Sequence, residues 1–286
     1  MPSVLVAVCA VLGLLVGSFL NVVIARVPAG ESVVRPRSRC PRCGAPIAAR
    51  DNVPVVSWLL LRGRARCCGV PISARYPAVE LVTAASFALV AAWSIGAFGA
   101  GASDAAAAVP ASGPLVPAAW GGSLWPLPAF EFLAAVSVAL VAVDLEHLRL
   151  PFWLVVPSWW IGAGLLGGAA LLMGRPDAAV RMLLGGVAYW GLYRLLYAVS
   201  RGRLGYGDVR LAGLLGGYLA WVSWGTLVLG AYLATFVGGI AFVGLLLARR
   251  AGLKTELPYG PPMIIGAWLG LFWGQQLADA YIGRFG

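Results

Sequence analysis

Residues 132–151, FLAAVSVALVAVDLEHLRLP, begin with an apolar run that is interrupted by a carboxylate, Asp144. Such a run predicts a helix that crosses a lipid bilayer, because one crossing takes about 20 apolar residues. A second carboxylate, Asp208, stands at the edge of another apolar run in residues 203–217, RLGYGDVRLAGLLGG. An ionisable side chain at the edge of a membrane span is costly, so each aspartate is a candidate for a functional site.

The rest of the chain is as apolar as these two stretches. Of its 286 residues, 60% are hydrophobic and 11% are charged, which is more apolar surface than a soluble domain can bury. The apolar runs are continuous rather than alternating, and this pattern predicts helices. We therefore expect an all-α, polytopic transmembrane bundle of about eight helices. The predicted spans are residues 3–24, 77–98, 125–146, 152–173, 178–199, 226–248 and 262–282, with a shorter, partial or tilted span at 209–222.

The arginines predict the orientation of this bundle. Ten of them lie in residues 25–76, and the positive-inside rule places that segment in the cytoplasm. Alternation of the spans then puts the N-terminus outside and leaves only three basic residues on the outer side. These are Arg175, Arg181 and Arg284. The basic segment has few aromatic residues, so we expect it to attract anionic lipid headgroups of the bilayer and not to bind nucleic acid.

The predicted spans divide the chain into three parts. Residues 1–24 form the first transmembrane helix; their apolar run is too long for the core of a signal peptide, so we expect the helix to be retained. Residues 25–76 form a small cytoplasmic insert that contains cysteines, and residues 77–286 form the main transmembrane core. The outer loop 99–124 is of low complexity.

The predicted topology brings the two aspartates to the same face of the membrane. Asp144 ends one span at the cytoplasmic face, and Asp208 begins the partial span at that face. Two neighbouring carboxylates share a proton, so one can activate water while the other polarises a carbonyl group. This predicts peptide hydrolysis. Each aspartate also has an ordinary explanation, since Asp208 could cap a helix and Asp144 could reach interfacial water. The only histidine, His147, leaves little room for a Ser–His or histidine-rich zinc site.

Five ordered stretches of the chain resemble the bacterial type IV prepilin peptidases. Residues 205–208, GYGD, match the GxGD signature of membrane aspartic proteases. The other four stretches are residues 17–28 (GSFLNVVIARVP), 51–59 (DNVPVVSWL), 75–80 (RYPAVE) and 258–261 (PYGP). The resemblance implies a multi-pass peptidase of the bacterial cytoplasmic (inner) membrane, with Asp144 and Asp208 as the catalytic pair.

The resemblance also implies substrates and a second activity. The substrates would be prepilins or pseudopilins of a type IV pilus or type II secretion system, cleaved after a glycine at the cytoplasmic face of the membrane. Members of the family with the cytoplasmic insert often methylate the new N-terminus with S-adenosylmethionine. Nothing in the residues themselves points to a site for this methyl donor.

Four cysteines of the insert predict a structural zinc site. Residues 40–44, CPRCG, form one half of a zinc knuckle. The family pattern has a second pair with the same spacing; here Cys68 matches, Ala65 stands at the partner position, and Cys67 is adjacent. We therefore predict zinc bound by Cys40, Cys43, Cys67 and Cys68. The alternatives are a three-cysteine site with another ligand, free thiols in a reducing compartment, and a redox pair.

Two polar residues near the inner ends of spans remain open to two interpretations each. Asn21 could form a hydrogen bond between helices or belong to a site. Glu80 could pair with a nearby arginine or position a substrate or cofactor.

Two other functions compete with the peptidase. A proton-coupled transporter would also carry acids in its membrane helices, but it would place them in mid-span and usually show repeat symmetry, which this sequence lacks. A non-catalytic partner in pilus or secretion assembly would keep the scaffold without needing either aspartate.

Overall fold

The computed structural model describes residues 2–35, 38–40, 42–96, 120, 123–201, 204–248 and 258–285. Within these ranges the chain forms nine α-helices, a short 3-10 helix and isolated β-bridges, but no strand. Eight of the α-helices are long, which confirms the predicted all-α bundle of about eight helices. The elements are α1 (Pro2–Arg26), η1 (Ala49–Asn52), α2 (Val56–Leu60), α3 (Arg75–Ser94), α4 (Leu127–His147), α5 (Phe152–Leu172), α6 (Pro176–Val199), α7 (Tyr206–Val222), α8 (Trp224–Leu247) and α9 (Gly260–Phe285). Most of the predicted outer loop 99–124 lies outside the described residues.

Contacts divide the chain into two compact units. The first unit contains Met1–Ala92 and Glu131–Ala142, and the second contains Trp93–Phe130 and Val143–Gly286. The cysteine-containing insert therefore belongs to the first unit, and both aspartates belong to the second.

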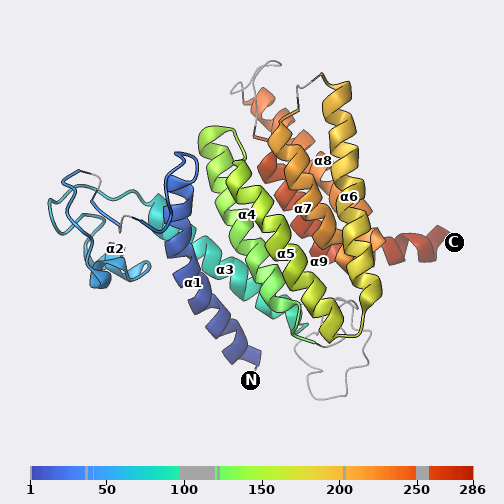
Figure 1. Ribbon diagram of the computed structural model, residues 1–286, viewed down its shortest axis with the longest axis horizontal. Helices are drawn as coiled ribbons and strands as arrows, with labels where there is room; N and C mark the ends of the chain where they lie inside the picture. Colours follow the sequence, from blue (N-terminus) through green and yellow to red (C-terminus); the bar gives the residue numbers. More distant parts are fainter. Residues whose placement is uncertain are drawn as a thin grey trace. The chain divides into compact units, whose positions relative to one another are not determined.

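In the first unit, glycines let α1 pack directly on the backbone of α3. A Cβ atom on Gly13 would lie 2.7 Å from the Cα of Ala84. One on Gly17 would lie 2.7 Å from the Cα of Glu80. Small residues at a helix interface permit this close approach within a membrane. The insert, with η1 and α2, connects the end of α1 to the start of α3 (Figure 1).

In the second unit, α7 is the central helix. It packs along α6 and beside α5, while α8 packs along α9 (Figure 1). Of the 17 residues of α7, 12 are buried. The contact with α6 is again made through a glycine, because a Cβ atom on Gly216 would lie 2.6 Å from the Cβ of Tyr189. The two helices therefore meet almost backbone to backbone.

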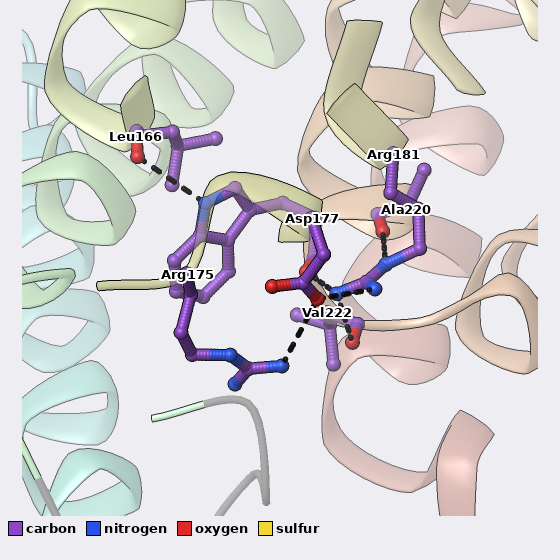
Figure 2. Close-up of polar contacts among 7 residues, drawn as sticks. Leu166, Arg175, Asp177, Arg181, Ala220 and Val222 are labelled. Atoms are coloured by element: carbon purple, nitrogen blue, oxygen red, sulfur yellow. Dashed lines mark hydrogen bonds and ion pairs between the residues drawn. The ribbon is translucent and has the colours of Figure 1, made fainter. Parts of the chain in front are cut away.

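Arg181 of α6 binds the C-terminal end of α7 (Figure 2). Its Nε donates to the carbonyl oxygen of Ala220 at 2.7 Å, and its Nη2 donates to that of Trp221 at 2.8 Å. Its Nη1 pairs with Asp177 at 3.2 Å. The last carbonyls of a helix lack partners within the helix, and a cation there also complements the helix dipole. The start of α6 and the end of α7 therefore lie together, and the two helices are antiparallel.

Six helices, α1, α3, α4, α5, α6 and α8, are long and apolar enough to cross a membrane. They coincide with six of the seven full spans predicted from the sequence. The seventh, 262–282, falls in α9, whose second half carries polar residues such as Gln275 and Gln276. The predicted partial span is α7, which at 17 residues is about 25 Å long and shorter than the hydrocarbon core of about 30 Å.

Candidate active site

Asp144 lies in the last turn of α4, where the chain reverses sharply. Leu148 ends the helix in the left-handed conformation, with φ 51° and ψ 34°, and its N–H donates to the carbonyl oxygen of Asp144 at 2.8 Å. A left-handed residue is a common helix ending, although glycine adopts it more easily. Pro151 then leads directly into α5. Although the sequence turns to charged residues here, the Asp144 side chain is only 4% exposed.

The backbone of Gly260 binds the Asp144 carboxylate. Its N–H donates to Oδ2 of Asp144 at 3.0 Å. Gly260 is the first residue of α9, so the amide belongs to the N-terminal end of a helix, which favours an acidic partner. A Cβ atom at this position would lie 2.7 Å from the same carboxylate oxygen. Only glycine therefore lets the backbone approach Asp144 this closely.

Asp208 is the third residue of α7 and is 8% exposed. Its backbone N–H donates to the carbonyl oxygen of Gly205 at 3.1 Å, and a Cβ atom on Gly205 would lie 2.9 Å from Oδ2 of Asp208. The carboxylate thus folds back over the glycine that precedes the helix. This position resembles helix capping, as the sequence alone allowed, but it also holds the carboxylate inside the second unit.

Leu150 lies between the two aspartate segments. A Cβ atom on Gly207 would lie 2.8 Å from the Cβ of Leu150, and one on Gly260 would lie 3.4 Å from its Cδ2. The end of α4, the start of α7 and the start of α9 therefore converge at one place. The structure brings the predicted pair together, while His147 is exposed.

The sequence did not assign a role to Gly260 or Leu150. Gly260 lies in the stretch PYGP, residues 258–261, but nothing in this stretch indicated which side chain its backbone would contact. Leu150 follows Asp144 in a short stretch of mixed charged and apolar residues, and leucines are common throughout the chain. Both roles depend on contacts between segments far apart in sequence.

The cysteines of the first unit lie on two turns of the same design. Arg39 pairs with Pro46 in one antiparallel bridge, and Arg64 pairs with Pro71 in the other. The N–H of Gly44 donates to the carbonyl of Cys40 at 2.9 Å in the first turn. In the second turn, the N–H of Gly69 donates to that of Ala65 at 2.8 Å. Ala65 therefore occupies the position that Cys40 has in the first turn, as the spacing predicted.

Despite this substitution, four sulfur atoms gather at one point. The Sγ atoms of Cys43 and Cys67 are 3.3 Å apart, and those of Cys40 and Cys68 are 3.6 Å apart. The adjacent Cys67 and Cys68 have their Sγ atoms 3.8 Å apart, and all four sulfurs lie within 4.8 Å of one another. Tetrahedral zinc with Zn–S bonds of about 2.3 Å requires sulfurs about 3.8 Å apart. The cluster could hold such an ion, with Cys67 in the place of the ligand that Ala65 lacks.

Backbone amides prepare one of these sulfurs for metal binding. The N–H groups of Cys43 and Arg42 lower the pKa of the Cys40 thiol to about 6. The thiolate is the form that binds metal ions. Cys40 is buried, whereas the other three cysteines of the cluster are exposed.

The chain is similar to known protein families and to individual proteins over most of its length. Residues 11–94 match the bacterial Peptidase A24 N-terminal domain, and residues 131–247 match the type IV leader peptidase family. A prepilin leader peptidase/N-methyltransferase of Aeromonas hydrophila is 34% identical over 95% of this chain and 92% of its own length. Proteins with the same description from Pseudomonas aeruginosa and Myxococcus xanthus are 33% and 41% identical, over 98% and 86% of this chain and 94% and 65% of their own lengths. No solved structure gives a significant match.

Proposed function

The chain belongs to the type IV leader peptidase family, and we propose that it cleaves the leader peptides of type IV prepilins or pseudopilins and methylates the new N-terminus. Cleavage would follow a glycine at the cytoplasmic face of the bacterial inner membrane. The N-terminus of the chain would lie outside and the cysteine-containing insert would lie in the cytoplasm. The excess of arginine in residues 25–76 supports this orientation.

The convergence of Asp144 and Asp208 carries the peptidase proposal. Both carboxylates are buried and belong to the same corner of the second unit. In the proposed mechanism, the ionised carboxylate takes a proton from water as the water attacks the scissile carbonyl carbon. The protonated carboxyl group donates a hydrogen bond to the carbonyl oxygen and later protonates the leaving amine. The Gly260 amide would hold Asp144 in position throughout.

This arrangement favours hydrolysis over the two competing functions. The acids lie at the ends of α4 and α7 rather than in mid-helix, where a proton pathway would need them. A non-catalytic assembly partner would not need two buried carboxylates at one place, since buried charge is costly.

Substitution of either aspartate tests the peptidase. We expect Asp144→Asn and Asp208→Asn each to slow leader removal from a prepilin in membranes by at least about 10²-fold, because one proton-transferring group is lost. Asp177→Asn is the matched control, since Asp177 is an exposed carboxylate at the start of α6. Normal processing by either aspartate variant would exclude the proposed pair and favour a non-catalytic role.

We also propose that Cys40, Cys43, Cys67 and Cys68 bind a structural zinc ion. The sulfur distances support a tetrahedral site, and such an ion would fix the two turns of the insert.

Metal analysis of purified protein tests this zinc site. We expect about one zinc per chain, and less than about half an equivalent in Cys67→Ser, because one of the four ligands is removed. The double variant Ala65→Cys with Cys67→Ala moves the ligand to the position equivalent to Cys40 and should retain the metal. Zinc content that does not change in Cys67→Ser would show that Cys67 is not a ligand.

S-adenosylmethionine is the methyl donor that the proposed second activity implies. When bound, it would supply an activated methyl group for transfer to the amine of the new N-terminus.

A further inference from the structure

A cavity of about 680 Å³ lies in the first unit, and its lining includes neither Asp144 nor Asp208. Its walls are the C-terminal end of α1, the start of α3, η1, α2 and the two cysteine turns. This volume is in the range of cavities that bind small ligands. The lining includes Asn21, Glu80, Trp58 and Tyr76. Neither the peptidase mechanism nor the zinc site uses any of these four residues.

Asn21 brings an unsatisfied acceptor to this cavity. Its side chain is 4% exposed, and its Nδ2 donates to the carbonyl oxygens of Gly17 at 3.3 Å and Tyr76 at 3.1 Å. Because both partners are carbonyl oxygens, they identify the donating atom as the amide nitrogen, and the other atom of the amide is its oxygen. That oxygen, Oδ1, is buried and has no hydrogen-bond partner among the described residues. A buried acceptor without a partner is costly, so the oxygen suits a ligand that supplies an N–H.

Glu80 brings a carboxylate to the same cavity. It is 7% exposed, and its Oε2 accepts the N–H of Val55 at 2.7 Å. Val55 has φ 60°, which is a strained conformation for a β-branched residue and persists only where the surroundings hold it. Among the described residues, Glu80 forms no ion pair with an arginine or lysine, which was one of the two interpretations that the sequence left open.

The packing of α1 on α3 places both acceptors together. Gly17 contacts the backbone of Glu80, and Asn21 follows Gly17 by one helical turn on the same face of α1. Asn21 also reaches Tyr76, which lies one turn before Glu80 on α3. Two buried acceptors, one of them a carboxylate, thus line the cavity at the α1–α3 contact. Such an environment suits a cationic amine.

We propose that this cavity binds the α-ammonium group of a small ligand through Oδ1 of Asn21 and the carboxylate of Glu80. The rings of Trp58 and Tyr76 provide flat apolar surface for the remainder of the ligand. Trp58 is fixed in place because its Nε1 donates to the carbonyl oxygen of Ile72 at 3.1 Å. The proposal rests on the methylation in the proposed function, since the methyl donor and the new N-terminus of a processed pilin both carry an α-ammonium group.

Calorimetric binding to the purified full-length protein tests the proposal. S-adenosylhomocysteine carries the α-ammonium group of the donor, whereas 5′-methylthioadenosine lacks the amino-acid part. We expect Glu80→Gln and Asn21→Ala to weaken binding of S-adenosylhomocysteine about 10- to 100-fold, the usual effect of losing a hydrogen bond to a charged group. Binding of 5′-methylthioadenosine should change less than about threefold in the same variants. Glu31→Gln, at an exposed glutamate outside the cavity, is the matched control.

A second probe identifies the source of the ammonium group. The probe is a short peptide with the N-terminal sequence of a processed pilin. If this peptide binds and its N-acetylated form does not, the cavity receives the pilin. Loss of this binding in Glu80→Gln would support the proposal. Affinities that are unchanged in both variants, or no binding of either probe, would overturn it. Equal losses for 5′-methylthioadenosine would also overturn it. Leader cleavage by the wild-type protein in the same preparation separates these results from a failure of the proposed peptidase.

Discussion

At the residue scale, Gly260 shows how little space the candidate active site leaves. Its backbone N–H binds Asp144, and the carboxylate oxygen lies where a side chain at this position would begin. The sequence could predict the two aspartates, because carboxylates are rare and conspicuous in an apolar chain. It could not predict their partner, because one glycine among 38 gives no sign of what its backbone contacts. The same holds for Asn21, whose unpaired oxygen becomes visible only when α1 and α3 are packed together.

Gly260→Ala should slow leader cleavage without unfolding the protein. The added Cβ would lie 2.7 Å from the Asp144 oxygen, so the carboxylate has to move. A displacement of about 1 Å in a catalytic group can reduce a rate about 10²-fold. Gly239→Ala in α8, where the added Cβ meets no atom within 4 Å of the described structure, is the control. Cleavage rates in membranes measure both variants, and an unaffected rate in Gly260→Ala would remove the proposed positioning role.

At the element scale, the sequence predicted the long helices well because their apolar runs are continuous. Six spans were confirmed, and the weak run at 209–222 proved to be the short, buried α7. What periodicity could not predict was the central place of α7. A short run next to Asp208 and Arg210 gives a poor membrane signal, although the helix makes the core of the second unit. The sequence indicated only the first of the two matching cysteine turns clearly, because Ala65 interrupts the cysteine spacing of the second.

Arg181→Ala should destabilise the α6–α7 pair. Its guanidinium donates hydrogen bonds to carbonyl oxygens at the end of α7. In the variant these oxygens lose their partners, which should lower the free energy of unfolding by about 1–3 kcal/mol. Arg194→Ala, an exposed arginine on the same helix, should change it by about 0.5 kcal/mol or less. Chemical denaturation in detergent micelles measures both. Equal effects in the two variants would mean that the hydrogen bonds to α7 contribute nothing to stability.

At the scale of the whole molecule, the two proposed chemistries belong to different units. The aspartate pair lies in the second unit, and the cysteine cluster and the cavity lie in the first. The distribution of the arginines predicted that both chemistries occur on the cytoplasmic side of the membrane. One arginine that is an apparent exception to the positive-inside rule has a structural reason. Arg181 was assigned to the outer side, yet its side chain is 17% exposed and is bound to α7 and Asp177. A basic residue held by the protein itself carries little information about topology.

Thiol labelling tests the predicted orientation. Cys43, Cys67 and Cys68 are exposed on the insert. After zinc is removed with a chelator, we expect a membrane-impermeant maleimide to label them in inverted vesicles and not in intact spheroplasts. Labelling is measured by mass spectrometry, with detergent-solubilised protein as the positive control. Labelling in intact spheroplasts would reverse the predicted topology.

The contact between Arg181 and α7 also bears on how the chain enters the membrane during synthesis. Alone, α7 is a weak candidate for insertion, since it is short and carries Asp208 and Arg210 near its start. Each charge in the apolar layer opposes partitioning into lipid by roughly 2.5–3.5 kcal/mol if it reaches the bilayer centre. In the native structure, α6 supplies both the packing surface and the guanidinium that closes the end of α7. We therefore expect α6 and α7 to enter the membrane together, as an antiparallel helical hairpin.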